Sequence, residues 1–117
     1  MARRERLICR SAELAEQGSG VRFELAGQGK PAPAFVVRFE GVARGFLNQC
    51  GHVPVELDWQ EGEFFDDSRL YLICATHGAL YHPASGACVG GRCAGRGLIP
   101  VPVVEHDGHV YVMEEEQ

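Results

Sequence analysis

Two mixed pairs of cysteine and histidine constrain this chain more than any other feature. Cys50 and His52 form a Cys-x-His pair, and Cys74 and His77 form a Cys-x-x-His pair after the intervening residues 53 to 73. Each pair follows a segment predicted to be a β-strand, so each is expected on a loop at a strand end. Two thiols and two imidazoles supplied by two loops make a four-ligand metal site of mixed softness. The fold must therefore bring two distant loops together.

This order of ligands resembles the signature of the Rieske proteins, Cys-x-His followed by Cys-x-x-His. The resemblance implies one 2Fe-2S cluster per chain, in which two thiolates hold one iron and two imidazoles hold the other. Carried over to this sequence, Cys50 and Cys74 would bind the inner iron, and His52 and His77 the outer iron. Histidine ligation places the reduction potentials of the family between roughly −150 and +300 mV.

Two other interpretations of the same four residues stay open. Each pair alone is a weak signal, because Cys50 and Cys74 would serve equally well as small core residues and His52 and His77 as loop histidines. A Cys₂His₂ set also suits tetrahedral zinc. Zinc fingers, however, keep at least two residues between paired ligands and group cysteine with cysteine, whereas here the pairs are mixed. The two pairs together, in this order, favour the iron–sulfur site.

Short alternating segments between Gly- and Pro-rich turns predict an all-β chain. The helical signal is a single turn at 11–16, with Ser11 as its N-cap. We expect one Rieske 2Fe-2S domain, 1–117, built as a small antiparallel β-sandwich or barrel with an inserted, loop-rich cluster-binding subdomain at about 48–98. The predicted strands are 21–25, 35–40, 42–47 and 70–73, with a hairpin of 101–105 and 109–112 and an extended hairpin at 63–69.

The residues that follow the second pair extend the resemblance to about residues 7–112. Gly78, Tyr81, Pro83 and a turn at Ser85-Gly86 match the family, as does a Gly-rich run that covers the cluster in its members. Arg92 is a departure, since the family often has proline after the glycine at this position. The aromatic Tyr81 is expected either to donate to a ligand cysteine sulfur or to serve as a core aromatic.

Three departures bear on the reduction potential that the resemblance implies. High-potential members carry an extra cysteine in each ligand loop, where this chain has Val55 and Thr76, and a serine that donates to a bridging sulfide, where it has Ala79. Fewer hydrogen bonds to cluster sulfur stabilise the reduced state less. We therefore expect a potential in the lower part of the family range.

Composition and charge limit the compartment and the class of partner. A net charge of −5 argues against nucleic acid and against an anionic membrane as partners. No apolar run is long enough to span a bilayer, and no apolar signal region follows Arg3 and Arg4, so we expect a cytoplasmic chain. In that reducing compartment we expect thiols at Cys88 and Cys93 first, a disulfide between them second, and an extra metal site third. The default for the remaining candidates is a core residue for Cys9 and turn or surface histidines for His82, His106 and His109.

The resemblance implies an electron carrier that is a component of a multicomponent oxidoreductase and not a catalyst alone. The 117 residues leave no room for the second domain in which Rieske oxygenases hold a mononuclear iron. We expect a soluble Rieske-type ferredoxin, monomeric or weakly oligomeric, that accepts one electron from a flavin reductase and delivers it to an oxygenase component or similar acceptor. The imidazole edges of His52 and His77 would form its exit port, and docking would be small and transient.

Two alternatives remain beside the ferredoxin. The chain also resembles the small Rieske subunit of a larger oxidoreductase such as assimilatory nitrite reductase, and a zinc-bound or metal-free interaction module would belong to another class. The apolar flank of the port would either contact a partner or shield the cluster, and the acidic side chains nearby would either steer a basic partner or be solvated. The flank comprises Val53, Pro54 and Leu80, and the acidic side chains are Glu61, Glu63, Asp66 and Asp67.

Overall fold

The computed structural model describes residues 3–25, 32–50, 56–58, 60–75, 78–91 and 96–115. Within these residues the chain forms three antiparallel sheets, which confirms the all-β prediction, and no helix there is long and apolar enough to cross a bilayer. The elements are β1 (Arg3–Arg10), the 3-10 helix η1 (Ser11–Glu13), β2 (Val21–Leu25), β3 (Ala32–Phe39), β4 (Val42–Leu47), β5 (Leu72–Ile73), β6 (Leu80–Tyr81), β7 (Cys88–Gly90), β8 (Pro100–Val101), β9 (Val103–His106) and β10 (His109–Glu115).

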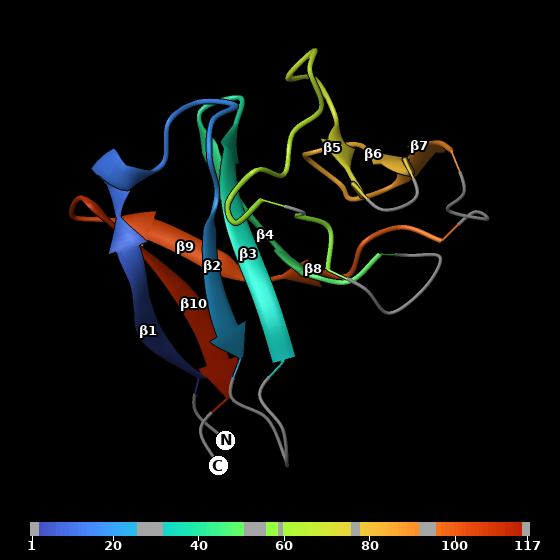
Figure 1. Cartoon of the computed structure of the whole chain (residues 1–117). Helices are drawn as coiled ribbons and strands as arrows, with labels where there is room; N and C mark the ends of the chain where they lie inside the picture. The colour runs from blue at the N-terminus through green and yellow to red at the C-terminus, as the bar shows by residue number, and fades with distance from the viewer. Residues whose placement is uncertain are drawn as a thin grey trace.

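The two larger sheets pack together and the small one extends from them (Figure 1). Sheet A has the strand order β1-β10-β9, and sheet B has the order β2-β3-β4-β8. Sheet C, with the order β5-β6-β7, lies beyond sheet B at the right of the view. Strand β1 pairs with β10, with Arg3 opposite Glu115, so the first and last strands of the chain are neighbours in sheet A.

Strand β3 is the wall between two cores. Its residues 34–37 are all fully buried, and their side chains alternate between the two faces of sheet B. Phe35 and Val37 join a cluster with side chains of sheet C, whereas Ala34 and Val36 belong to clusters with residues of β10. The aromatic ring of Phe35 stacks on that of Phe64, with 3.9 Å between ring centroids. The prediction missed the first three residues of β3, of which Ala32 and Pro33 are not buried, because proline is rare inside a strand and the Gly- and Pro-rich sequence here indicated a turn.

A charged pair joins β3 to β9 at the edge of the second core. The Arg38 guanidinium donates to both carboxylate oxygens of Glu105, at 2.6 and 2.9 Å, and its Nε donates to the Leu14 carbonyl at 2.9 Å. The hydrogen bond from Arg38 lowers the pKa of Glu105 to about 2. The pair therefore carries a full charge on both partners over the neutral pH range.

The C-terminal hairpin is confirmed, but its first strand begins two residues later than predicted. Strand β9 pairs Val103 with Val112, and Asp107 and Gly108 form the turn, both with positive φ. Val101 lies instead in β8, opposite Gly45 of β4. The intervening residue is Pro102, which has no N–H to donate, so the chain changes sheets at this point.

Two other local predictions are wrong in detail. Ser11 is not an N-cap: its N–H bonds to the carbonyl of Gly108 at 2.8 Å, so η1 begins at Ser11 itself and Arg10 is the N-cap. The strand predicted at 70–73 begins only at Leu72, because Leu70 is 52% exposed in the tip of a hairpin. That tip corresponds to the hairpin predicted at 63–69, with Phe65 bridged to Leu72.

Candidate metal centre

The first ligand loop leaves the end of β4. The Leu47 N–H bonds to the carbonyl of Ile99 at 2.9 Å, and the Asn48 N–H bonds to that of Pro33 at 2.9 Å, so the start of the loop is fixed. Cys50 follows and is 3% exposed. The predicted ligand His52 lies outside the described residues.

The second ligand loop is a tight reversal between β5 and β6. Cys74 is fully buried directly after β5, its N–H bonds to the Ala79 carbonyl at 2.9 Å, and its own carbonyl accepts from the Gly78 N–H at 2.7 Å. Gly78 has a φ of 72°, a conformation that glycine adopts without a Cβ penalty. His77 lies inside this reversal but outside the described residues.

Leu57 connects the two loops. Its N–H bonds to Oδ1 of Asn48 at 2.8 Å, at the base of the first loop, and its carbonyl accepts from the N–H of Ala75 at 3.0 Å, in the second loop. The Leu57 side chain is fully buried in the same cluster as Cys50 and Cys74. Two hydrogen bonds of the Leu57 main chain, one to the Asn48 side chain and one to the Ala75 main chain, therefore join the loops that carry the two cysteines.

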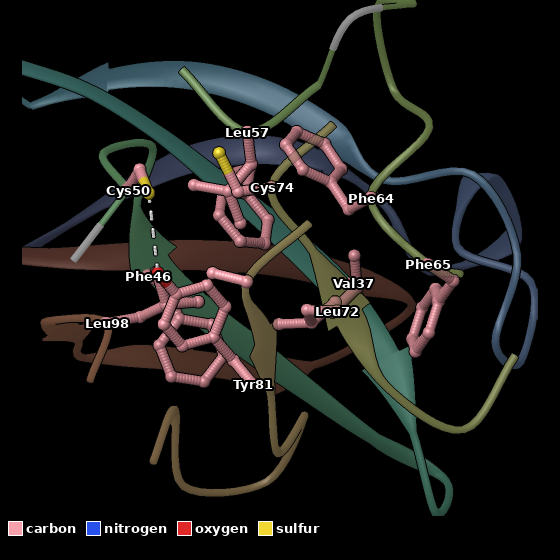
Figure 2. Close-up of a cluster of buried hydrophobic side chains, with 12 residues drawn as sticks. Val37, Phe46, Cys50, Leu57, Phe64, Phe65, Leu72, Cys74, Tyr81 and Leu98 are labelled. Carbon is pink, nitrogen blue, oxygen red and sulfur yellow. Dashed lines mark hydrogen bonds between the residues drawn. The ribbon is translucent and has the colours of Figure 1, made fainter. Parts of the chain in front are cut away.

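The two cysteines suit a sulfur-ligated iron site. Both are buried and carry no disulfide, and both belong to one apolar cluster with Tyr81, Phe64 and other side chains of sheets B and C (Figure 2). Buried thiolates supplied by separate loops are the soft donors that iron–sulfur clusters use. The described residues contain no group of three or more His, Cys, Asp or Glu placed to hold a metal ion. The described half of the predicted ligand set is thus two thiols, and the two histidines lie in the undescribed parts of the loops.

Tyr81 is a core aromatic whose hydroxyl also lies within hydrogen-bond distance of a cysteine sulfur. Its ring is fully buried on β6, and its hydroxyl lies 3.5 Å from Sγ of Cys50, as the dashed line in Figure 2 shows. Ala79, where the family's serine would stand, is also fully buried. A phenol hydrogen bonded to a ligand sulfur stabilises charge on that sulfur.

Gly91 contacts the second ligand loop directly, a role that the sequence predicted only as part of a covering Gly-rich run. A Cβ at Gly91 would lie 2.6 Å from the carbonyl oxygen of Gly78 and 2.8 Å from Cα of Ala79, and Gly91 has a φ of 76°. Any other residue would displace the second loop. The predicted departure at Arg92 lies outside the described residues.

A buried polar network beside the first loop was not predicted. Asn48 is 2% exposed and donates through Nδ2 to Oδ1 of Asp58 at 3.0 Å, and Oδ2 of Asp58 accepts from the N–H of Gly62 at 3.0 Å. Nε of Arg22 lies 3.7 Å from the same carboxylate, and its Nη2 bonds to Glu56 at 2.5 Å. A single Asn after a strand does not predict a buried polar network, because its hydrogen-bond partner Asp58 is ten residues away in the sequence.

Three of the acidic side chains expected near the port contact neighbouring side chains. Glu61 lies 3.7 Å from Arg22, and Ser19 donates to Glu63 at 3.3 Å. Asp66 accepts from the Ser68 hydroxyl at 2.7 Å within its own hairpin. These contacts hold loops in place, and Val53 and Pro54 of the predicted apolar flank lie outside the described residues.

The remaining cysteines behave differently from each other. Cys9 is a core residue, as predicted, and burial raises the pKa of its thiol to about 11. Cys88 is disulfide-bonded, so the thiol expected first at this position is wrong. That expectation depended on an assumed reducing compartment and not on the loop geometry. Cys93, the predicted partner, lies outside the described residues.

The other histidines are engaged locally. Nδ1 of His82 accepts from the N–H of Ala84 at 3.1 Å, as a turn histidine does. His106 lies at the surface with Nε2 2.8 Å from Glu5 and Nδ1 3.0 Å from Asp107, and hydrogen bonds to Asp107 and then Glu5 raise its pKa. Neither lies on the loops of the predicted ligands.

Comparison with known proteins supports this arrangement. The Rieske [2Fe-2S] domain family matches residues 5–114 of the chain. The structure resembles a ferredoxin of Sphingomonas yanoikuyae B1, with a TM-score of 0.70 and 23% identity over 96% of this chain and 100% of that one. It also resembles a chain in the complex of reduced oxygenase and oxidized ferredoxin in carbazole 1,9a-dioxygenase, with a TM-score of 0.72 and 18% identity over 97% of this chain and 95% of that one.

A third similar structure is a larger protein. The terminal oxygenase of carbazole 1,9a-dioxygenase from Novosphingobium sp. KA1 gives a TM-score of 0.72 and 27% identity, and the match covers 97% of this chain but 29% of that one. Comparison with curated protein sequences gave no match. The same fold thus occurs both as a separate chain and as part of a longer one.

Proposed function

Because the chain belongs to the Rieske [2Fe-2S] domain family, we propose that it is a ferredoxin that carries single electrons on a 2Fe-2S cluster between redox proteins. The observation that carries this proposal is that Cys50 and Cys74 are both buried in one cluster, on two loops joined by hydrogen bonds. When bound, such a cluster supplies a one-electron couple whose potential depends on its ligands and their hydrogen bonds.

The proposed ligands are Cys50 and Cys74 for one iron and His52 and His77 for the other. Support comes from the family match, the burial of both thiols and the position of each histidine two or three residues after its cysteine. The protein supplies the ligands, keeps water from the thiol side through its apolar cluster, and donates toward Cys50 from Tyr81.

The proposed electron donor is a flavin reductase and the proposed acceptor an oxygenase component or similar protein. Support for the acceptor is the similarity to a chain in an oxygenase–ferredoxin complex. We expect a monomer or weak oligomer with a small, transient docking surface, since redox encounters are usually of this kind. We also propose a cytoplasmic location, with which the thiol of Cys9 agrees and in which the disulfide of Cys88 would be an exception.

A matched set of cysteine variants tests the cluster. The purified protein is expected to be red-brown, to contain two irons and two sulfides per chain, and to give a Rieske-type paramagnetic resonance spectrum after dithionite. Cys50→Ser and Cys74→Ser should lose the iron, whereas Cys9→Ser, which replaces a buried thiol in a different core cluster, should keep it. A colourless protein with stoichiometric zinc would instead support an interaction module, and full iron in Cys74→Ser would exclude the ligand assignment.

A second candidate function is that of a Rieske subunit or domain in a larger oxidoreductase. The specific observation is the match to 29% of an oxygenase chain, in which this fold is one part. Size-exclusion chromatography of the protein from its native cells distinguishes the two. A free electron carrier elutes near the mass of one or two chains, whereas a subunit elutes with its partner. Reduction of an oxygenase component by the dithionite-reduced protein in stopped flow then identifies the carrier.

A further inference from the structure

We propose that Asn48 and Asp58 are positioning residues that hold the first ligand loop in register with the second. We call this pair the Asn48–Asp58 clamp. The proposal rests on the cluster function above and adds to it the element that sets the spacing of the two cysteines. No ligand is assigned to either residue.

The amide of Asn48 has both of its polar atoms engaged. Oδ1 accepts from the N–H of Leu57 at 2.8 Å, and Nδ2 donates to Oδ1 of Asp58 at 3.0 Å. The N–H of Leu57 can only donate and an ionised carboxylate can only accept, so these partners define which way the amide points. The side chain therefore spans the first ligand loop from its first residue to the point where the chain returns, with Cys50 between.

The carboxylate of Asp58 fixes the amide in this orientation. Its side chain has no exposed surface, and its second oxygen accepts from the N–H of Gly62 at 3.0 Å, with Nε of Arg22 at 3.7 Å. The carbonyl of Gly62 accepts in turn from the N–H of Gly20 at 2.7 Å, next to the start of β2. A buried carboxylate held by two hydrogen bonds and facing a cation resists reorientation. The clamp is thus anchored in sheet B.

Leu57 transmits the position of the clamp to the second ligand loop. While its N–H is held by Asn48, its carbonyl accepts from the N–H of Ala75, the residue directly after Cys74. Leu57 therefore links Asn48, which lies two residues before Cys50, directly to Ala75, which follows Cys74. Loss of the amide of Asn48 frees the N–H of Leu57 and leaves the carboxylate of Asp58 without its partner, which is costly for buried groups.

The geometry provides a rescue design. In Asn48→Asp two carboxylates would face each other, and in Asp58→Asn one oxygen would have to serve both the amide of Asn48 and the N–H of Gly62. In the double variant Asn48→Asp/Asp58→Asn, the new carboxylate accepts from Leu57 and from the new amide, whose oxygen accepts from Gly62. Every hydrogen bond of the clamp is then rebuilt, and only the one between the two side chains has its donor reversed.

The first measurement is the rate of iron release to a chelator, followed by loss of visible absorbance. Asn48→Ala and both single exchanges should release iron about tenfold faster or more than the unmodified protein, as for other residues that orient ligands. The double variant should release iron more slowly than either single variant. Val110→Ala, a truncation in the core on the other side of β3, should lower the free energy of unfolding without this acceleration.

The second measurement does not depend on iron release. Amide hydrogen exchange in the purified, cluster-loaded protein should become faster at Leu57 and Ala75 in Asn48→Ala and return toward the rate of the unmodified protein in the double variant. If Asn48→Ala fails to fold, the hydrogen-exchange rates of Asn48→Asp and Asp58→Asn are compared with those of the double variant instead. The proposal is overturned if the double variant releases iron as fast as the single variants, or if Val110→Ala releases iron as fast as Asn48→Ala. A protein that never binds iron refutes the proposed function, and unchanged exchange at Leu57 and Ala75 separately refutes the clamp.

Discussion

Replacing Glu105 by Gln should destabilise the protein at neutral pH and have progressively less effect as the pH falls. Glu105 on β9 receives two hydrogen bonds from Arg38 on β3, which together with a hydrogen bond from Ser11 lower its pKa from 4.5 to about 2. A pKa lowered by folding stabilises the folded state above the unfolded-state value and stops doing so as the pH falls through the folded-state value. The stabilisation is therefore complete above about pH 5.5 and is lost between about pH 4.5 and 2.

The magnitude follows from the same two values. A pKa difference of this size corresponds to at most about 3 kcal/mol at 1.36 kcal/mol per pKa unit. The Glu105 side chain is 27% exposed and that of Arg38 15%, so screening by water leaves an expected contribution of about 1–2 kcal/mol. By about pH 3 more than half of this contribution should be gone.

Urea unfolding at pH 7, 5, 4 and 3 measures the difference between Glu105→Gln and the unmodified protein. Glu40→Gln is the matched control, because the Glu40 carboxylate is 67% exposed and lies 3.8 Å from its cation. The control should change the free energy of unfolding by less than about 0.5 kcal/mol at every pH. A difference for Glu105→Gln that stayed constant from pH 7 to 3 would refute the proposed role of the charged pair.

Three further outcomes are expected. Tyr81→Phe removes the hydroxyl 3.5 Å from Sγ of Cys50 and should lower the reduction potential by about 20–65 mV in voltammetry, the equivalent of one hydrogen bond of about 0.5–1.5 kcal/mol; an unchanged potential would contradict this role. Gly91→Ala forces a Cβ to 2.6 Å from the carbonyl of Gly78 and should cost about 1–3 kcal/mol in urea unfolding, with cluster loss; a fully stable, loaded variant would count against the contact. Phe35→Ala empties a fully buried, stacked position and should cost about 3–5 kcal/mol in the same assay, and a cost under 1 kcal/mol would be inconsistent with that packing.

The limits of prediction from the sequence can be traced to particular residues. Alternation predicted β2 with its correct bounds, and an apolar-rich run after a turn predicted β4 with its correct bounds. Strand β3 was predicted only from Phe35 onward, since the Gly- and Pro-rich residues before it, up to Pro33, indicated a loop. Pro102 moved the start of the last hairpin, an effect that depends on which sheet each neighbour joins. Local patterns carry no information about that choice.

The candidate site shows the same division. Cys50 and Cys74 were predicted from spacing, and their shared burial agrees with that prediction. The ligand roles of His52 and His77 stay predictions. Asn48 and Asp58 were missed because a buried polar pair is defined by a contact across a loop, and the residue types alone do not predict that contact. The state of Cys88 was missed because it depends on redox conditions that the sequence does not encode.

The position of β3 between two cores has a consequence for how the molecule comes apart. Phe35 and Val37 face one core and Ala34 and Val36 the other, so displacement of β3 would open both cores at once. The cooperative unit should therefore be the whole domain, with one melting transition and no stable half. Partial proteolysis is then expected to yield intact protein or small peptides, without a persistent core fragment.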